Sequence, residues 1–534
     1  MSGLMKLHDL LELSAERFGS NPAIIHGAQS VTYTGLYHLV LKLSDRLLKS
    51  NLKAGDRVAL WCENSIQYIA SYFAILKAGL VVVPVDTSLH PDKIDFILND
   101  CSAKGLITQS KNSRYLDSII KNNPQLSFIA TDRNISIADD NIDFFAIADM
   151  ICSLNGNQSD AENKTSVSDS DHFAYLKAKS DIAPHELAAI FYTSGSTGKS
   201  KGVMLSHLNL ISNTIGTVEY LKLTKNDRVL VVLPFYYIYG NSLLLTHIAV
   251  GGTVVIENRF AYPETALAAM EKENVTGFSG VPSTFMILLN STSFAQHKFP
   301  SLRYFTQAGG GMSPEIIKKL ADAFPEKEIY IMYGQTEASP RVTWLPPDKL
   351  QEKMGSIGIE VPGVHVKIIN ESGDEASIGE EGEIVVGGNS VMMGYWDQSN
   401  GHDKVLNDGW LYTGDLARMD EDGYIFIVGR KKEIIKSGGN RVSAKELEEC
   451  ILKIDGIIEV AVFGVEDPVL GEAIHAAVVK NDDDISEKII KDFCAVNISS
   501  HKVPKYITFM DSLPKYQTGK INKPALKQEF NDSK

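Results

Sequence analysis

The chain has 534 residues, more than a single hydrophobic core usually holds, so we expect at least two packed units. Hydrophobic residues make up 44% and charged residues 22% of the sequence, which is typical of a globular protein. Acidic side chains number 66 against 52 basic ones. The resulting net charge of −14 disfavours a protein whose main work is to coat nucleic acid or an anionic membrane.

The N-terminal segment and the cysteines favour a cytoplasmic protein with no stable membrane insertion. Residues 1–18 carry acidic side chains among their leucines, so they lack the apolar core of a signal peptide. They predict instead a helix that packs by one face. The five cysteines are scattered and none stands in a C-x-x-C pair, which disfavours both a disulfide framework and a zinc ribbon.

Further along the chain, short β-branched runs alternate with helix-length segments. Helices are expected at 66–77 and 263–272. The strands expected around them lie at 58–61, 80–85, 187–192, 229–233, 252–257 and 329–332. Strands that alternate with helices predict α/β layers built on largely parallel sheets.

Two segments depart from this alternation. Residues 229–256 carry no charged side chain and are long enough to cross a bilayer. Because Pro234, Gly251 and Gly252 interrupt the segment, we interpret it as a strand, a turn, a helix and a second strand. The stretch 153–171 has almost no apolar side chains and predicts a mobile loop, since it has too little to bury.

After about residue 355 the pattern changes to short strands and turns, with strands expected at 364–369, 382–386 and 424–428. A capping box from Ser443 to Glu446 then predicts the start of a helix in a compact α+β region. We therefore predict a large N-terminal domain of layered α/β sheets with a small β-barrel-like subdomain over residues 1–430. A small, mobile C-terminal α+β domain is expected over residues 431–534.

The most informative segment is the glycine-rich loop that follows the strand at 187–192. Its glycines let the backbone approach a ligand closely, and its hydroxyl and ammonium groups suit phosphate oxygens, so we predict a polyphosphate ligand. The tail of the loop matches a P-loop, but the first glycine of that motif would fall at Thr193. Residues 203–206 also predict a strand where a P-loop opens into a helix. The alternative is a flexible surface hairpin.

Several further motifs follow this loop in a fixed order. They are Y-G-Q-T-E at 333–337, W-L-Y-T-G-D at 410–415, G-R-K-K-E-I-I-K at 429–436 and P-K-Y-Q-T-G-K at 514–520. With these motifs the chain resembles, from about Val31 to Leu526, the superfamily of acyl-CoA synthetases, peptide-synthetase adenylation domains and luciferases. The resemblance is closest to the acyl- and aryl-CoA ligases.

The resemblance implies an AMP-forming acid–thiol ligase that works in two steps. A carboxylate attacks the α-phosphate of ATP to give an acyl-adenylate and pyrophosphate, and a thiol then takes the acyl group. Charge develops on the α-phosphate during the attack, so the site needs cations already in place. The implied substrates and cofactors are a small carboxylic acid, ATP, Mg²⁺ and CoA, or the phosphopantetheine of an acyl carrier protein in place of CoA. No nucleic acid partner is expected.

The resemblance also assigns the nucleotide site residue by residue. The β- and γ-phosphates would lie in the loop formed by Thr193, Ser194, Gly195, Ser196, Thr197, Gly198 and Lys199. The rest of the ATP and AMP site would comprise Gly309, Gly310, Gly311, Tyr333, Gly334, Gln335, Thr336, Asp415 and Arg430. Within this set the glycines and Tyr333 would hold the adenine, and Asp415 and Arg430 the ribose hydroxyls. The alternatives are that Asp415 caps a turn and that Arg430 forms only an ion pair.

Three residues would act at the reaction centre. Thr336 would contact the α-phosphate, Glu337 would hold Mg²⁺, and Lys520 would bridge the carboxylate, the ribose and the α-phosphate. Lys432 resembles the hinge about which the C-terminal domain turns. The residues expected on the thiol and CoA side are Lys436, Ser437, Gly438, Gly439 and Arg441. Arg441 alternatively pairs only with Glu446.

The acyl pocket is where the sequence departs from its relatives. Its expected residues are Tyr236, Tyr237, Tyr239, Met332 and Arg341. Tyr237 stands where many acyl- and aryl-CoA ligases have a histidine and where amino-acid adenylation domains have an aspartate nearby, so an α-amino acid substrate is disfavoured. A buried Arg341 would suit a second carboxylate or a polar acyl group, whereas an exposed one beside Pro340 would not.

Three functions stay open on the sequence. The first is a CoA ligase for a medium, aromatic or functionalised acid, and the second is an adenylation enzyme that loads a carrier protein. The segment 338–354 is too short for the insertion of fatty-acyl-AMP ligases, which favours CoA as the acceptor. The third is a phosphate-releasing NTPase, against which the incomplete P-loop and the presence of Lys520 argue.

Overall fold

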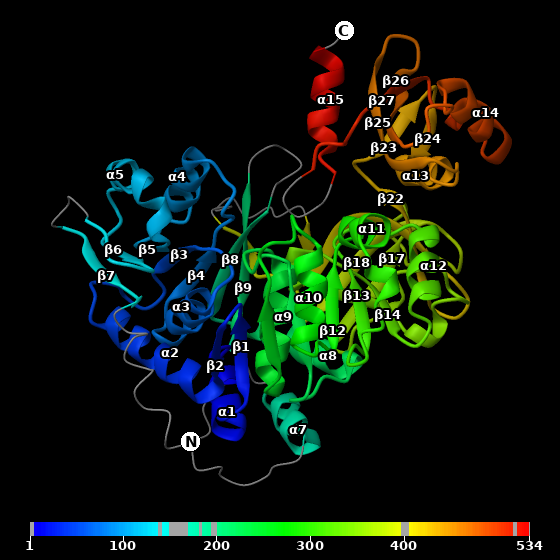
Figure 1. Cartoon of the computed structure of the whole chain (residues 1–534). Coiled ribbons are helices and arrows are strands. Elements are labelled where there is room, and N and C mark those ends of the chain that lie inside the picture. Colours follow the sequence, from blue (N-terminus) through cyan, green and yellow to red (C-terminus); the bar gives the residue numbers. More distant parts are fainter. Residues whose placement is uncertain are drawn as a thin grey trace.

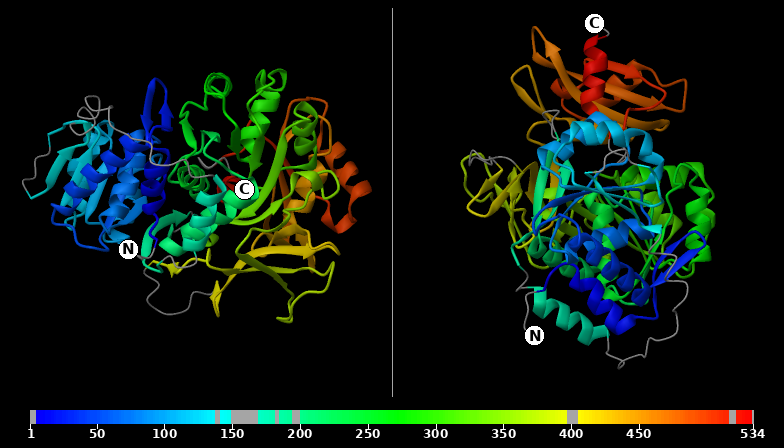
Figure 2. Two further views of the ribbon diagram at one scale, coloured as in Figure 1. Left: turned by 90° about the horizontal axis from the view of Figure 1, so that it is seen from below. Right: turned by 90° about the vertical axis from the view of Figure 1, so that its left-hand side faces the viewer.

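The computed structural model describes residues 5–136, 141–148, 169–180, 184–193, 200–396, 405–515 and 521–532. Four sheets organise these residues, two large ones and two of five strands. Figure 1 shows the two large sheets side by side, with the C-terminal sheet standing above them. In Figure 2, the left view shows the two large sheets side by side and the right view shows the C-terminal sheet above them.

The nine-stranded sheet supplies most of the site described below. Its strands from edge to edge are β16 (Ile359–Glu360), β15 (Arg341–Leu345), β14 (Glu328–Gly334), β13 (Tyr304–Gln307), β12 (Gly277–Gly280), β10 (Arg228–Val231), β11 (Thr253–Ile256), β1 (Pro22–His26) and β2 (Gln29–Thr32). From β14 to β1 every pairing is parallel, while β15, β16 and β2 are antiparallel.

The eight-stranded sheet has the order β19 (Gly394–Tyr395), β9 (Lys201–Ser206), β8 (Leu187–Thr193), β4 (Val81–Pro84), β3 (Arg57–Trp61), β5 (Gly105–Thr108), β6 (Phe128–Thr131) and β7 (Asp143–Ala146). Its pairings from β8 to β7 are parallel, and those of β8 with β9 and of β9 with β19 are antiparallel. Both large sheets therefore have the parallel centre that the alternating sequence pattern predicts.

The helices of this part cover and join the two large sheets. They are α1 (Asp9–Phe18), α2 (Tyr33–Leu48), α3 (Ile66–Lys77), α4 (Pro91–Asp100), α5 (Ser113–Asn122), α7 (Asp169–Ser180), α8 (His207–Leu221), α9 (Ile238–Val250), α10 (Glu264–Lys272), α11 (Pro282–Ser291) and α12 (Pro314–Ala323). Every residue of α9 is buried, because this helix packs on apolar residues of both sheets in one continuous core.

The uncharged segment 229–256 forms β10, α9 and β11, as its interrupted pattern predicts. No helix in the described ranges is long and apolar enough to cross a membrane. The predicted loop at 153–171 lies mostly outside the described residues, but its last three residues belong to α7, so that prediction was wrong there. The helix is anchored by His172, whose imidazole Nε2 lies 2.7 Å from the carbonyl oxygen of Ala249.

The two small sheets follow in the chain. One consists of β17 (Val364–Ile369), β18 (Gly382–Gly388), β21 (Trp410–Met419) and β20 (Leu406–Asn407), with β22 (Ile425–Arg430) paired to β21. The C-terminal sheet consists of β24 (Asn440–Ser443), β23 (Ile434–Ser437), β26 (Gly471–Lys480) and β25 (Ile457–Asp467), with β27 (Tyr506–Phe509) paired to β26. The C-terminal helices are α13 (Ala444–Ile451), α14 (Glu487–Asn497) and α15 (Lys523–Asp532). Ser443 caps α13, as predicted.

Candidate active site

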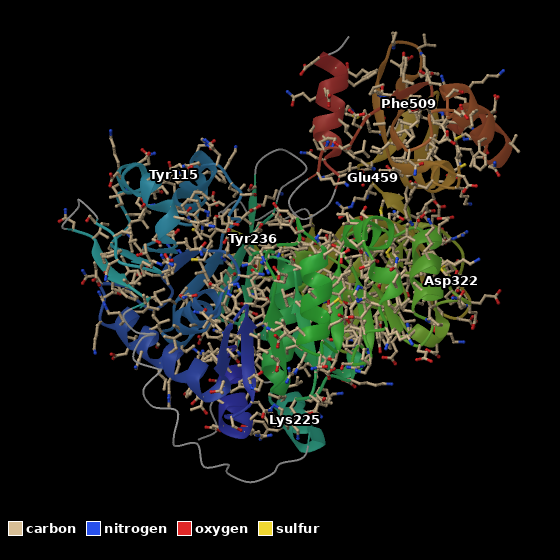
Figure 3. All side chains as sticks on the ribbon, in the orientation of Figure 1. Tyr115, Lys225, Tyr236, Asp322, Glu459 and Phe509 are labelled. Carbon is tan, nitrogen blue, oxygen red and sulfur yellow. The ribbon has the colours of Figure 1, made fainter. Side chains whose placement is uncertain are left out.

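Part of the predicted site lies at one edge of the nine-stranded sheet. Because β10, β12, β13 and β14 are parallel, the loops that follow them meet at the carboxyl end of the sheet, where ligands of α/β proteins bind. These loops carry Tyr236 and Tyr237, the glycines at 309–311 and the segment 335–337. Figure 3 shows Tyr236 near the centre of the molecule, on the side of the large sheets that faces the C-terminal sheet.

Three residues from two different sheets form a hydrogen-bonded cluster beside this edge. The hydroxyl of Tyr333, at the end of β14, donates to Asp415 Oδ2 over 2.7 Å. The guanidinium Nε of Arg430 donates to Asp415 Oδ1, also over 2.7 Å. Asp415 and Arg430 are direct cross-strand partners in the β21–β22 pair, so the strand register brings the two together.

The charges of this cluster are fixed by its surroundings. Burial, and then the charge of Asp415, raise the pKa of Tyr333 well above its usual value, so the phenol keeps its proton and donates. Burial opposes the charge of Arg430, but Asp415, Glu433 and Tyr333 together outweigh it and raise the pKa of the guanidinium. The side chain of Asp415 is 4% exposed and that of Arg430 is 54% exposed. The carboxylate is thus held rigidly beside a cation that still reaches solvent.

The loop after β13 requires a glycine for two reasons. Gly309 has a φ of +86°, and a Cβ atom there would lie 2.8 Å from the hydroxyl oxygen of Tyr237. The side chain of Gln307 holds the loop by donating from Nε2 to the carbonyl oxygen of Gly310 over 2.7 Å. Gln307 Oε1 and Gln335 Nε2 are buried atoms without a hydrogen-bond partner within the described ranges. Two such buried polar atoms, next to a loop whose backbone can approach a ligand closely, suit a ligand rich in hydrogen-bonding groups.

Glu337 lies in a short 3₁₀ turn, Thr336–Ala338, directly after β14. Its Oε1 accepts a hydrogen bond from the hydroxyl of Tyr395 over 2.7 Å. The ammonium of Lys201 lies 4.5 Å from the centre of the Tyr395 ring. Glu337 is therefore connected to the strands β9 and β19 of the other large sheet. Tyr395 was not expected from the sequence, since no local motif indicates a contact across 58 residues.

The glycine-rich loop joins two antiparallel strands. Thr193 is the last residue of β8 and pairs with Lys201 at the start of β9. The chain therefore enters a strand after the loop, as predicted, and the helix α8 begins only at His207. Residues Ser194, Gly195, Ser196, Thr197, Gly198 and Lys199 lie outside the described residues, and so does Lys520.

The residues expected on the thiol side lie in the C-terminal sheet. Lys432 is exposed in the turn between β22 and β23. Gly438 and Gly439 form the β23–β24 turn with φ values of +56° and +80°, which glycine adopts without strain. Lys436 pairs across the strands with Arg441, whose side chain lies outside the description. Ser437 is buried in the same sheet.

Within the described ranges, no recorded hydrogen bond or ion pair joins this hairpin to the large sheets. The helix α13 contacts the small sheet through β22 and approaches the loop after β13. Lys445 donates from Nζ to the carbonyl oxygen of Ile427 over 2.8 Å, and its Cε lies 3.8 Å from the Cβ position of Gly311. Lys445 was missed by the sequence analysis, although it belongs to the predicted capping box.

The acyl-side residues form a buried layer behind Tyr237. Tyr239 is buried and its hydroxyl donates to the carbonyl oxygen of Thr306 over 3.1 Å. Arg341 is 2% exposed, so the alternative of an exposed arginine was wrong. Its Nη1 lies 2.9 Å from the sulfur of Met332. The arginine is buried because the antiparallel β14–β15 pair places it inside the sheet edge rather than on a surface turn.

Family models and known proteins place the chain among enzymes. The model of the AMP-binding enzyme matches residues 11–396, and the model of the AMP-binding enzyme C-terminal domain matches residues 446–520. The chain belongs to the AMP-binding enzyme family. The predicted resemblance is thereby confirmed, as are the α/β fold class and the class of acid–thiol ligase.

Curated members of the AMP-binding enzyme family match along almost the whole chain. A long-chain-fatty-acid–CoA ligase of Escherichia coli O157:H7 is 32% identical, over 98% of this chain and 94% of its own. A putative acyl-CoA synthetase, YngI, of Bacillus subtilis is 31% identical, over 97% and 96%. Among solved structures, ATP-bound MatB from Rhodopseudomonas palustris superposes with a TM-score of 0.85 at 27% identity, over 99% of this chain and 100% of its own.

Proposed function

We propose that this protein joins a carboxylic acid to CoA with ATP, in two chemical steps. A carboxylate oxygen attacks the α-phosphorus of ATP, the bond to the β-phosphate breaks, and pyrophosphate leaves. The CoA sulfur then attacks the acyl carbon, and AMP leaves as the thioester forms. The observation that carries the proposal is the Tyr333–Asp415–Arg430 cluster, since three separate motifs meet there at the ligand-binding edge of a parallel sheet.

In this proposal the cluster holds the nucleoside. Asp415, fixed by two donors, keeps lone pairs that accept the ribose hydroxyls, and Arg430 shields its charge. The loop at 309–311 approaches the adenine closely, and the orphaned atoms of Gln307 and Gln335 bond the bound nucleotide. Gly334 lets the turn after Tyr333 form, because a Cβ there would lie 1.6 Å from the carbonyl oxygen of Pro340.

The phosphate side combines the glycine-rich loop with Thr336 and Glu337. Mg²⁺ usually takes one or two protein carboxylates together with phosphate oxygens and water, so a single glutamate suits it. Glu337 fits, because only its Oε1 has a recorded partner in the described part of the chain. When bound, the ion would neutralise charge on the phosphates. Tyr395 holds the carboxylate of Glu337 in place.

The C-terminal residues serve the two steps in turn. Lys520 supplies a positive charge to the α-phosphate during adenylation, while the hairpin with Lys436, Ser437, Gly438, Gly439 and Arg441 serves thioester formation. We place the domain boundary between residues 430 and 431, beside the exposed Lys432, because the turn before Ile434 leads from one small sheet into the other. A rotation of the small domain about this point would replace Lys520 at the reaction centre by the residues of the hairpin.

The acceptor and the location are further parts of the proposal. Two curated relatives that match along the whole chain bear the names of a CoA ligase and an acyl-CoA synthetase, which favours CoA over a carrier protein. A reducing compartment such as the cytoplasm fits the cysteines, since Cys62, Cys101, Cys450 and Cys494 are buried thiols.

The test is ATP turnover by the purified full chain with a pool of carboxylic acids, with and without CoA. The expected products are AMP and pyrophosphate that depend on the acid, with an acyl-CoA when CoA is present. An acid-dependent adenylate that CoA leaves intact would move the acceptor to a carrier protein. Release of ADP and orthophosphate would overturn the adenylation proposal altogether.

A further inference from the structure

Arg341 is a buried cation without a counter-charge in the described part of the chain. It is 2% exposed and is the largest of the fully buried side chains. Its recorded hydrogen-bond neighbours in the described ranges are the sulfur of Met332, 2.9 Å from Nη1, and Ser242 Oγ, 3.5 Å from Nε, and the guanidinium also acts on the hydroxyl of Tyr239. Nη2 has no partner among the described residues. A guanidinium carries five N–H donors and stays charged, so a thioether and neutral hydroxyls satisfy it poorly.

Other arginines of the same fold show what a satisfied guanidinium looks like. Arg303 donates from Nη2 to Asp227 over 2.9 Å, and Arg46 bonds Asp143 with two of its nitrogens. Both pairs join a cation to a carboxylate, as the cost of removing a charge from water demands. Arg341 is more deeply buried than either of these arginines and has no such partner in the described ranges.

The position of Arg341 is fixed by its backbone rather than by an ion pair. Its N–H donates to Asn213 Oδ1 over 3.1 Å, and its carbonyl oxygen accepts from Asn213 Nδ2 over 2.7 Å. The guanidinium carbon lies 4.3 Å from the centre of the Tyr239 ring, which orients the charged group over an aromatic face. The side chain is therefore held in place before any ligand binds.

A short row of contacts leads from the nucleotide side to this cation. The hydroxyl of Tyr237 lies 2.8 Å from the Cβ position of Gly309, and its ring centre is 6.4 Å from that of Tyr239. Tyr239 in turn lies under Arg341. Burial raises the pKa of Tyr237 to about 12, and the charge of Arg341 opposes that rise, so the cation acts on the side chain next to the nucleotide loop. Arg341 thus lies on the acyl side of the proposed reaction centre.

We infer that the acid activated by this protein carries a second carboxylate, and that Arg341 binds it through the N–H groups that have no partner in the described structure. The inference rests on the proposed function and deepens it by naming a dicarboxylic acid as the substrate class. A planar guanidinium and a carboxylate bond in pairs, which would satisfy both groups in a water-poor site. An alkyl chain would instead leave the cation buried against methylene groups, which disfavours a simple fatty acid.

The test compares matched acids on the full chain. Pyrophosphate release is measured with succinate, glutarate and adipate, and with butyrate, pentanoate and hexanoate as partners of equal length. For one diacid, kcat/KM is expected to exceed that of its matched mono-acid by about 100-fold, the usual difference for hydrogen bonds to a charged group. In Arg341→Met, which keeps the volume but removes the charge, that ratio is expected to invert: the diacid loses about 100-fold, chiefly in KM, and the mono-acid gains.

Two controls keep the outcome readable. Arg418 is an exposed arginine on β21, and Arg418→Met is expected to leave the ratio as it is. Binding of the preferred diacid is also followed by its upward shift of the melting temperature with a non-hydrolysable ATP analogue present, a shift that Arg341→Met should lose. Equal rates for each matched pair, with no change of ratio in Arg341→Met, would overturn the inference while leaving carboxylate activation intact. If neither the diacids nor the mono-acids give any pyrophosphate release, that result would count against the proposed function itself.

Discussion

The nucleotide side and the acyl side of the site treat their charged groups in opposite ways. On the nucleotide side, Asp415 is bonded by Tyr333 and Arg430, so the charges satisfy one another before a ligand arrives. On the acyl side, Arg341 is more deeply buried than Arg430, yet it has no carboxylate partner among the described residues. In the proposed function, the side that binds the nucleotide is pre-formed, whereas the acyl side leaves a buried charge that the substrate would have to satisfy.

The largest expected effect lies between the two sides, at Lys520. Replacing it in Lys520→Ala should lower acyl-adenylate formation by at least about 100-fold, because a preorganised charge at the α-phosphate is lost. Thioester formation from a preformed adenylate should continue. Pyrophosphate release and adenylate discharge are measured separately.

Lys515 offers a matched control for that experiment. It is the second residue of the same motif and bonds Glu459, so Lys515→Ala should leave adenylation nearly as it is. If both half-reactions fall together in Lys520→Ala, the role assigned to this lysine is wrong.

The next largest effect is expected when the pre-formed cluster of Tyr333, Asp415 and Arg430 is broken. In Asp415→Asn the ion pair with Arg430 is lost, although an amide oxygen still accepts from Tyr333. The KM for ATP should rise about 10- to 100-fold, the usual range for a hydrogen bond to a charged group. Asp420→Asn, which removes a carboxylate from the end of the same hairpin, is the control and should leave the KM for ATP unchanged. An unchanged KM in Asp415→Asn would show that the cluster is only structural.

A smaller effect is expected where the two sides touch, at Gly309. Gly309→Ala forces a Cβ to within 2.8 Å of the Tyr237 hydroxyl at a φ of +86°, and kcat/KM should fall about 10-fold. Adding Tyr237→Phe removes that hydroxyl and should recover about 1 kcal/mol of the transition-state stabilisation lost in Gly309→Ala. A double-mutant cycle measures this recovery as the coupling energy between the two positions.

Gly373 separates contact from backbone strain in this test. It has a φ of +90° with no atom within 4 Å of its Cβ position, so Gly373→Ala carries the strain alone. If kcat/KM fell as far in Gly373→Ala as in Gly309→Ala, the loss would not come from the contact with the Tyr237 hydroxyl.

The mildest test alters only the free energy of unfolding, through α9 on the acyl side. Burial lowers the pKa of His247 from 6.5 to about 4. Because the folded-state pKa is depressed and the group is a base, the unfolded chain binds the proton more readily as the pH falls below 6.5. The free energy of unfolding should therefore drop by about 2 kcal/mol from this residue between about pH 7 and pH 5.

Urea unfolding at both pH values measures this drop. His247→Gln, which does not titrate, should show a loss smaller by about that amount. Equal losses of unfolding free energy in the two proteins would mean that the His247 imidazole takes up its proton in the folded protein as readily as in the unfolded chain. The comparison also bears on the acyl side, since a protonated His247 would be a buried cation on α9, the helix that carries Ser242 and Tyr239 next to Arg341.

Much of the fold followed from local pattern. The strands β3, β8, β11 and β14 lie where β-branched runs predict them, because a buried parallel strand must be apolar on both faces. The helix α9 was separable from its strands because a proline and two glycines flank it. The start of α7 was missed, since its anchor is a contact between His172 and a helix far along the chain.

The sequence by itself determined the family and the class of reaction, because each motif is a short run that can be read without the fold and the motifs follow one another in a fixed order. The roles of the residues in these motifs stay predictions. Only the tertiary structure decided that Asp415 meets both Tyr333 and Arg430, that Tyr395 holds Glu337, and that Arg341 is buried without a counter-charge in the described chain. The physical reason is that strand register and burial depend on contacts between distant segments. Whether an arginine is a solvated surface charge or a substrate ligand therefore depends on what packs around it.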